Sequence, residues 1–550
     1  MPEQNNRQFF FIKIAICLLV ISNLSFSKVI TYKFLQSKPK SIYKDYYIWR
    51  YLDQNISSNN AFSLISEVKS MNKKLFIRFA RKINKKVYKK VLKCYMLKPN
   101  EFLKQDADCI KIGFSIYDGT KLSKEKLGII EHIIKDKYKK LDKSLKILSS
   151  NTPFKMLLKA KKDIFFNIFN NVGSKYRQKW LNKTIKHNKI LLYSKNQKFN
   201  KTIKLIVTNL KLKNLQKSLL DINGSNLSAQ SNFFLAMNSL KFNENKKALQ
   251  YLDIANKKYY FRFDKDKVLF WKYLISNNLE FLYTLSKSFD INIYSLYALH
   301  KLGVQPKNIV NNLTCVNTKP KINIENPFEW LNILDKLNNK DSNKTKIAKS
   351  FKSCDELPFK AFALERVNYK RYNYFIQPYK KYLNSYSDDK KALILAIARQ
   401  ESRFIPTSIS SSYALGMMQF MPFLAKAIAK QEKIKDFKLD DMFKPKIAYN
   451  FSYRHIKYLQ RKLKQPLFIA YAYNGGIGFT KRMLKNGFFQ KGKFEPYLSM
   501  ELIPYAQSRR YGKKVMANYL IYSNLLGEHI NIKSLFQKLI QPSHNLYSQK

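Results

Sequence analysis

Apolar residues recur every three to five positions through much of the chain before residue 368, and this spacing is typical of one face of an α-helix. The segment 267–289 is an example, with apolar residues at Leu269, Tyr273, Leu274, Leu279, Leu282 and Leu285. Asn277 and Asn278 interrupt its pattern, so the sequence predicts two short helices joined at these asparagines.

A second pair of helices is expected just before this one, over Phe233–Lys241 and Lys246–Lys257. Small and apolar residues that let two helices approach closely stand at Ala236, Ala248, Leu252 and Ala255. Successive short helix pairs predict an irregular solenoid of helical hairpins, whose curved surface can hold or encircle a polymer. A plain helical bundle is the alternative, and the pattern leaves open whether a solenoid would close into a ring.

Glycine is sparse in the first part of the chain and denser in the last part. Residues 28–367 contain only Gly113, Gly119, Gly128, Gly173, Gly224 and Gly303. Strands and tight turns need more such breaks, so an all-α fold is favoured. Eight of the chain's 14 glycines follow Pro378, where we expect the entry to a second domain. The polar stretch between Asp341 and Pro358 predicts a hinge or a last short hairpin.

The first 27 residues have the layout of a secretory signal. Arg7 and Lys13 precede an apolar run, residues 14–21, and small residues stand at Ser25 and Ser27. This apolar run is too short to span a membrane. We therefore expect cleavage before Lys28 and a periplasmic protein, with a buried N-terminal helix or an uncleaved anchor as the alternatives.

The charge of the chain is strongly positive, at +65 over 550 residues. Such a field favours anionic partners, including nucleic acid, anionic membranes and carboxylate-bearing cell wall. The lysine-rich run Lys135–Ile147 is one stretch that could face an anionic strand. The alternative is a drift in amino-acid composition, in which the lysines are solvated surface residues and the charge needs no partner.

The sequence lacks the motifs that are typical of metal-binding and nucleotide-binding proteins. The six histidines lie at His132, His187, His300, His455, His529 and His544, with no metal-ligand spacing, and no glycine-rich phosphate loop occurs. We therefore expect no metal, no nucleotide and no other cofactor.

Four cysteines remain beyond the signal segment, and an even number in an exported chain indicates disulfides. Their positions favour Cys94 with Cys109 and Cys315 with Cys354, although four cysteines allow three connectivities.

Glu401 is the strongest candidate for a catalytic group. It follows the apolar positions Leu393, Ile394, Ile397 and Ala398 on a helix that Asp388 and Asp389 are expected to cap. A carboxyl group beside apolar residues is desolvated, so its pKa rises and it can act as a general acid near neutral pH. An ion pair with Arg399 or Arg403 at the helix end is the alternative.

No Asp or Glu occurs from Ser402 to Gln431, although most glycosidases use two carboxylates. A lone acid suffices if the substrate supplies the nucleophile. The C6 hydroxyl of an N-acetylmuramoyl residue can attack its own anomeric carbon, so the missing carboxylate indicates non-hydrolytic cleavage.

Four blocks in order make the C-terminal part resemble the Slt-type lytic transglycosylases of the goose-lysozyme-like group. These blocks are RQES at 399–402, SYALGMMQFMP at 412–422, AYNGG at 472–476 and ELIPY at 501–505, the last followed by Arg509 and Tyr511. The resemblance covers roughly residues 378–527. The export signal and the long helical first half are similar in arrangement to the soluble members of that family, whose helical part closes into a ring.

This resemblance implies a domain organisation. We expect a signal peptide over residues 1–27, an α-helical superhelical domain with a short linker hairpin over 28–370, a lysozyme-like transglycosylase domain over 371–530 and a tail over 531–550.

The resemblance also implies roles for single residues. Glu401 would be the sole acid and base, Ser410 would touch the N-acetyl region of the substrate, and Tyr473 would hydrogen-bond near the catalytic carboxyl with support from Asn474. The remaining expected substrate-binding residues, along the glycan groove, are Met418, Gln419, Glu501 and Tyr505. Plain core packing is the alternative for Met418 and Tyr473.

Two of the four blocks depart from the family pattern. Tyr413 and Ala414 stand where the family usually has a glycine-alanine pair, and the bulk of Tyr413 could alter the groove floor. Gly475 and Ile477 replace the alanine and proline of the commoner AYNAGPG block, which makes that loop more flexible.

The resemblance implies cleavage of the β-1,4 bond between N-acetylmuramic acid and N-acetylglucosamine, leaving a 1,6-anhydromuramoyl end. A lysozyme-like hydrolase and a non-catalytic basic scaffold remain alternatives. The expected partners are peptidoglycan glycan strands, with room for other cell-wall enzymes and for peripheral membrane contact, while nucleic acid is not expected. The expected oligomeric state is a monomer.

Overall fold

A computed structural model describes residues 29–369 and 371–540 of the chain. The expected signal segment lies outside these residues. In the described ranges, none of the helices has the length and apolar character needed to cross a membrane. The fold is all-α, as predicted, and the one sheet in the described residues is a parallel pairing of β1 (Ile309–Val310) with β2 (Asn373–Tyr374).

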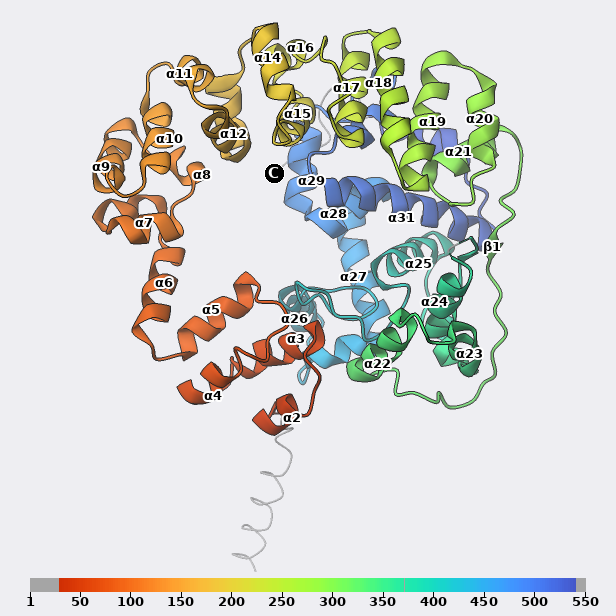
Figure 1. The fold of residues 1–550 in the computed structure, drawn as a ribbon. Helices are drawn as coiled ribbons and strands as arrows, with labels where there is room; N and C mark the ends of the chain where they lie inside the picture. Colours follow the sequence, from red (N-terminus) through yellow and green to blue (C-terminus); the bar gives the residue numbers. More distant parts are fainter. Residues whose placement is uncertain (1–28, 370, 541–550) are drawn as a thin grey trace, which may run out of the picture.

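Short helices follow one another around an arc in the first part of the molecule (Figure 1). In order they are α2 (Tyr32–Gln36), α3 (Ile42–Tyr51), α4 (Ser58–Ser63), α5 (Lys73–Lys82), α6 (Lys86–Met96), η1 (Pro99–Lys104), α7 (Ala107–Gly113), α8 (Ile116–Gly119), α9 (Lys124–Ile134), α10 (Lys139–Ser149), α11 (Pro153–Lys159), α12 (Lys162–Asn171), α13 (Ser174–Tyr176), η2 (Arg177–Leu181), α14 (His187–Ser194), α15 (Phe199–Val207), α16 (Lys213–Lys217), α17 (Ala229–Lys241), α18 (Asn245–Lys258), α19 (Arg262–Ser276), α20 (Leu279–Ser286) and α21 (Ile293–Lys301).

Both helix pairs predicted from apolar spacing are present, as α17 with α18 and α19 with α20. Asn277 ends α19 in the left-handed conformation, with φ of 55°, and the side chain of Asn278 caps α20 by accepting from the Glu280 amide. Asparagine tolerates the left-handed region and is a preferred N-cap, which explains why this pair of residues separates two helices.

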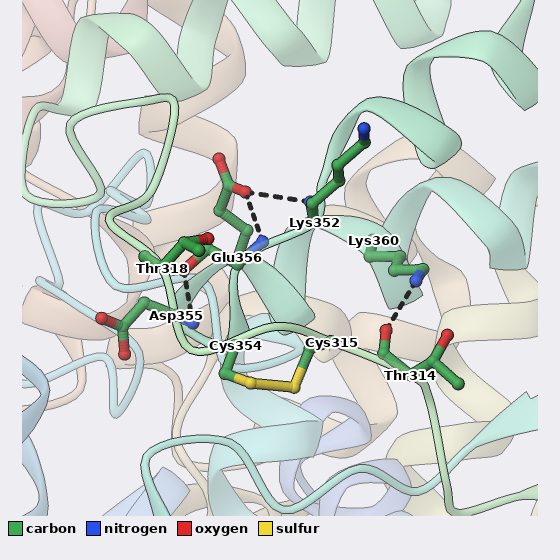
Figure 2. Close-up of a disulfide and its surroundings, with 9 residues drawn as sticks. Thr314, Cys315, Thr318, Lys352, Cys354, Asp355, Glu356 and Lys360 are labelled. Carbon is green, nitrogen blue, oxygen red and sulfur yellow. Dashed lines mark hydrogen bonds between the residues drawn. A yellow bond between two sulfur atoms is a disulfide. The ribbon is translucent and has the colours of Figure 1, made fainter.

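A long segment without helices leads from α21 to the second part of the chain and is fixed by a disulfide (Figure 2). Cys315 in this segment bonds to Cys354, and Lys360 donates a hydrogen bond to the Thr314 carbonyl oxygen at 2.7 Å. The other bridge joins Cys94 to Cys109. Both expected pairings are therefore confirmed.

The remaining elements form the C-terminal part of the molecule, and the polar stretch 341–358 contributes a short hairpin with α23 and α24. These elements are α22 (Pro327–Asn338), α23 (Lys344–Ser350), η3 (Cys354–Glu356), α24 (Leu357–Val367), η4 (Lys380–Tyr382), α25 (Asp388–Ser402), α26 (Pro422–Gln431), η5 (Leu439–Phe443), α27 (Pro445–Leu463), α28 (Pro466–Gly475), α29 (Ile477–Lys485), α30 (Tyr497–Leu502), α31 (Ala506–Leu525) and α32 (Ile532–Gln537).

The long helix α31 is the centre of this part, because α25 and α28 both pack along it. Its residues Val515, Met516 and Tyr522 are buried. Within the described part of the expected C-terminal tail, Phe536 of α32 packs on Tyr497 with ring centroids 5.3 Å apart.

The arc returns to the C-terminal part at both of its ends and so closes into a ring (Figure 1). At the far end, α21 packs on α31 and α17 packs on α30. At the near end, Arg50 of α3 pairs with Asp440 of η5 at 2.6 Å, and the Asn72 and Lys74 side chains donate to the carbonyl oxygens of Ser411 and Ser412 at 3.1 and 3.0 Å. The sequence alone left open whether the helical arc closes into a ring.

Candidate active site

Glu401 lies at the C-terminal end of helix α25. The helix residues from Ala392 to Arg399 are buried, and the helix ends where Arg403 adopts a left-handed φ of 57°. Ser387 occupies the N-cap position, which corrects the expectation that Asp388 and Asp389 form the cap. The two acids lie in the first turn instead, where their negative charges interact favourably with the positive end of the helix dipole.

The Glu401 carboxyl group is partly buried and has one hydrogen-bond donor. Tyr511 of α31 donates to its Oε1 atom at 2.7 Å. Burial raises the pKa of Glu401 to about 7, and the bond from Tyr511 acts in the opposite direction. Glu401 can therefore hold a proton near neutral pH and release it to a bound group.

The two arginines beside Glu401 pair with another acid. Arg403 Nε lies 3.1 Å from Glu365 Oε2, and Arg399 Nη2 lies 3.6 Å from Glu365 Oε1. Arg399 also donates to the Tyr374 carbonyl and to Asn518. The alternative of a helix-end ion pair for Glu401 is therefore wrong.

The loop after α25 folds back beside Glu401 and is held by its own polar side chains. Ser402 Oγ donates to the Met417 carbonyl at 2.9 Å, and Gln419 Nε2 donates to the Ser408 and Gly416 carbonyls at 3.0 and 2.8 Å. Gly416 has φ of 72°, and a Cβ atom there would lie 2.1 Å from the Met442 carbonyl oxygen. Only glycine fits this position.

Ser410 also stabilises this loop. Its Oγ atom accepts from the Ala414 amide at 2.9 Å, within a tight turn whose Tyr413 amide donates to the Ser410 carbonyl. Its predicted contact with an N-acetyl group, like the predicted groove position of Gln419, stays a prediction.

Met418 does not line a groove. Its side chain is fully buried, so the expected contact with the glycan is wrong and the core alternative holds. Its carbonyl oxygen accepts a hydrogen bond from the Tyr473 hydroxyl at 2.8 Å. Tyr473 thus lies near Glu401 without bonding to it, and the charge of Glu401 adds to the burial that raises the Tyr473 pKa. Asn474 Oδ1 accepts from Ser508 at the start of α31.

Glu501 does not reach a sugar site either. It is only 3% exposed, and its two oxygens are taken by Tyr294 of α21 and by Lys513, the latter at 2.6 Å. Glu501 therefore joins the arc to the C-terminal part. Tyr505 is 58% exposed and packs on Phe479, so it remains available to a ligand.

Two residues were missed as site residues, one that bonds to Glu401 and one that packs against Tyr473. Tyr511 stands in the fourth sequence block, but nothing local shows that it returns to a carboxyl group 110 positions earlier. His455 of α27 packs edge-on against Tyr473 with ring centroids 5.5 Å apart, and burial lowers its pKa to about 4. The ring is therefore neutral near pH 7. In the described ranges, no group of three His, Cys, Asp or Glu side chains is placed to hold a metal ion.

Residues 378–494, which include Glu401 and Tyr473, match the family model of the transglycosylase SLT domain. The C-terminal part of this chain therefore contains an SLT domain.

Curated proteins similar to this chain include soluble lytic murein transglycosylases. The protein from Salmonella typhimurium is 29% identical over 26% of this chain and 22% of its own length. A putative soluble lytic murein transglycosylase from Haemophilus influenzae is 31% identical over 27% of this chain and 25% of its own length. The chain spans about a quarter of the length of these curated relatives.

The whole fold has a counterpart among solved structures. An inactive mutant of the lytic transglycosylase Slt from Pseudomonas aeruginosa matches 91% of this chain and 89% of its own, with a TM-score of 0.50 and 14% identity. At this identity the match shows a shared fold, which extends over the helical arc.

Proposed function

We propose that this protein is a lytic transglycosylase that cleaves peptidoglycan between N-acetylmuramic acid and N-acetylglucosamine. The observation that carries the proposal is the environment of Glu401, a carboxyl group with a pKa of about 7 that bonds to Tyr511 and forms no ion pair with any described cation. The acids Glu365 and Glu501 are engaged by Arg403 and Lys513. We therefore assign the roles of acid and base to Glu401.

A single carboxyl group can perform both halves of this reaction. Protonated Glu401 gives its proton to the glycosidic oxygen, and the bond to the anomeric carbon breaks with its electrons moving to that oxygen. The N-acetyl oxygen of the muramoyl residue stabilises the positive charge. The Glu401 carboxylate then takes the proton of the C6 hydroxyl, whose oxygen attacks the anomeric carbon and closes the 1,6-anhydro ring.

The bond from Tyr511 orients Glu401 for both transfers. The site of action would be the periplasm, on the strength of the signal-like first 27 residues.

Digestion of purified sacculi followed by mass spectrometry of the soluble muropeptides tests this proposal. We expect 1,6-anhydromuramoyl ends from the wild-type protein and at least a thousandfold less product from Glu401→Gln, whose amide cannot donate the proton. Reducing ends in place of anhydro ends would identify a lysozyme-like hydrolase. Full turnover by Glu401→Gln would refute the catalytic assignment, and binding without turnover by the wild type would identify a scaffold.

A further inference from the structure

The arc carries a large groove on its inner side, away from Glu401. Residues of α8, α10, α12 and α15 line this groove, and α8, α12 and α15 lie toward the open centre of the ring in Figure 1. Its volume is about 800 Å³, within the range of about 300–1,000 Å³ that is usual for ligand sites. We call it the inner groove.

Four cations from three parts of the arc line the inner groove, and they are Lys111 of α7, Lys140 of α10, and Lys198 with Lys201 at the start of α15. Asp163 is the only acid in this lining, and it lies 3.6 Å from both Lys140 and Lys198. These two pairs are long and more than half exposed, so each contributes about 0–1 kcal/mol and can be exchanged for a ligand carboxylate. No described carboxylate pairs with Lys111 or Lys201.

Asparagines form the polar wall between these cations. Asn167, Asn170 and Asn171 share one face of α12, and neighbouring groups fix their amides. Asn170 Oδ1 accepts from Thr202 at 2.9 Å, and Asn171 Oδ1 accepts from Lys201 at 3.3 Å. Each amide has two donor hydrogens and two lone pairs, so bonding capacity remains for a ligand.

An aromatic ring completes the groove. Tyr117 lines it with 49% of its surface exposed, and the Lys121 ammonium group covers one face of the ring at 4.4 Å from the centroid, so a sugar would stack on the other face. The groove therefore combines separated positive charges, fixed amides and a half-exposed tyrosine ring.

We propose that the inner groove binds a carboxylate-bearing glycan-peptide strand, at a site separate from the one that cleaves it. This inference rests on the proposed function for the identity of the polymer. Lysines separated by amides fit a polymer whose carboxylates are separated by hydroxyl and amide groups. Asp163, between two lysines, disfavours nucleic acid, because every nucleotide would bring a further negative charge near it.

The lysine-rich run 135–147 shows that charge alone does not define this site. Of its lysines only Lys140 lines the groove, while Lys137 pairs with Asp108 at 2.7 Å and Lys146 pairs with Asp142 at 2.9 Å.

Binding measurements on the full chain with Glu401→Gln, which prevents turnover, test the inference. The probes are soluble uncross-linked glycan strands with their peptide stems, the same strands with carboxyl groups converted to amides, and single-stranded DNA of similar length. We expect Lys198→Gln with Lys201→Gln to raise the Kd for native strands roughly fivefold to tenfold. Asp163→Asn, which removes a repulsive charge, should lower the Kd for native strands. The amidated strands should bind the Glu401→Gln protein roughly as weakly as native strands bind the double lysine variant.

Lys155→Gln with Lys159→Gln is the matched control, because these exposed lysines of α11 lie outside the groove and the change in charge is the same. An equal loss of affinity in this control would overturn the inference in favour of general charge attraction. Equal binding of amidated strands, or tighter binding of DNA, would overturn it as well.

Turnover of sacculi separates this inference from the proposed function. Without the Glu401 substitution, the groove variant should keep the wild-type rate on short soluble muropeptides, since its lysines lie away from Glu401. If the wild type releases no product, the proposed function fails whatever the groove binds. If it releases anhydro ends but the groove variant binds strands normally, only the inference about the groove fails.

Discussion

The bond between Tyr511 and Glu401 sets both the geometry and the pKa of the candidate acid. Tyr511 donates to the carboxylate and thereby lowers the pKa that burial has raised to about 7. In Tyr511→Phe the pKa of Glu401 should rise further. Activity requires the protonated form and falls as the pH passes the pKa, so the alkaline limb of the kcat/KM profile should move to higher pH.

The same variant should lose rate at every pH, because a hydrogen bond to a charged group is worth about 1.5–3 kcal/mol, or roughly ten- to a hundredfold in kcat. Tyr519→Phe is the control. It removes a bond from the same helix to Asp389, at 2.5 Å, without touching Glu401. An unshifted alkaline limb in Tyr511→Phe would show that this bond does not tune the acid.

Single residues of the site could be predicted only where the local pattern determines their surroundings. The burial of the Glu401 carboxyl group, though not its role, is predictable because an apolar helix and an absence of nearby acids are visible in the sequence. Met418 was misplaced because its backbone, rather than its side chain, faces Tyr473. Glu501 was misplaced because its partners Tyr294 and Lys513 come from two other helices, which no motif reveals.

At the scale of elements, the loop at Tyr413 is joined to helix α3. Tyr413 stands where the SLT pattern usually has glycine, and it has a left-handed φ of 66°. Its buried ring packs against Tyr46 and Trp49 of α3, with centroids 6.0 and 5.6 Å apart. The side chain therefore points toward the start of the arc, and its packing offsets a strained backbone.

Tyr413→Gly should relieve about 1 kcal/mol of strain but lose about 3–5 kcal/mol of buried aromatic packing. We expect faster amide hydrogen exchange in α3 and α5, with α28 unchanged, because the near end of the ring is loosened. Tyr413→Phe keeps the ring and should exchange like the wild type. Unchanged protection of α3 in the glycine variant would show that Tyr413 does not hold the ring closed.

The helices themselves were predictable and the closure was not. Apolar spacing is a local signal, so the pairs around Asn243 and Asn277 could be located within a few residues. Closure depends on contacts such as Arg50 with Asp440, which are 390 positions apart and have no periodic signature.

At the scale of the whole molecule, a buried charge pair joins the far end of the arc to α31. Glu501 and Lys513 are 3% and 2% exposed, and Tyr294 of α21 donates to the same carboxylate. Burial alone would raise the pKa of Glu501, but the Lys513 and Lys267 ammonium groups outweigh it and hold the pKa below its ordinary value. This pairing therefore stabilises the fold above the unfolded-state pKa of Glu501 and is lost as the pH falls through the folded-state value. It is also lost at alkaline pH, because burial lowers the pKa of Lys513 to about 8.

Glu501→Gln should destabilise the protein by about 3–5 kcal/mol at pH 7, because it leaves the Lys513 ammonium buried without a counter-charge. Glu501→Gln combined with Lys513→Met should recover much of this loss, since the second change removes the unpaired charge. Urea unfolding at pH 7 measures both. Asp221→Asn, which breaks an exposed pair with Lys247 at 2.7 Å, is the control and should cost no more than about 1 kcal/mol. If the loss in free energy of unfolding of the double variant equals the sum of the losses in the Glu501 and Lys513 single variants, the two residues act independently. In that case packing rather than this pair holds the arc to α31.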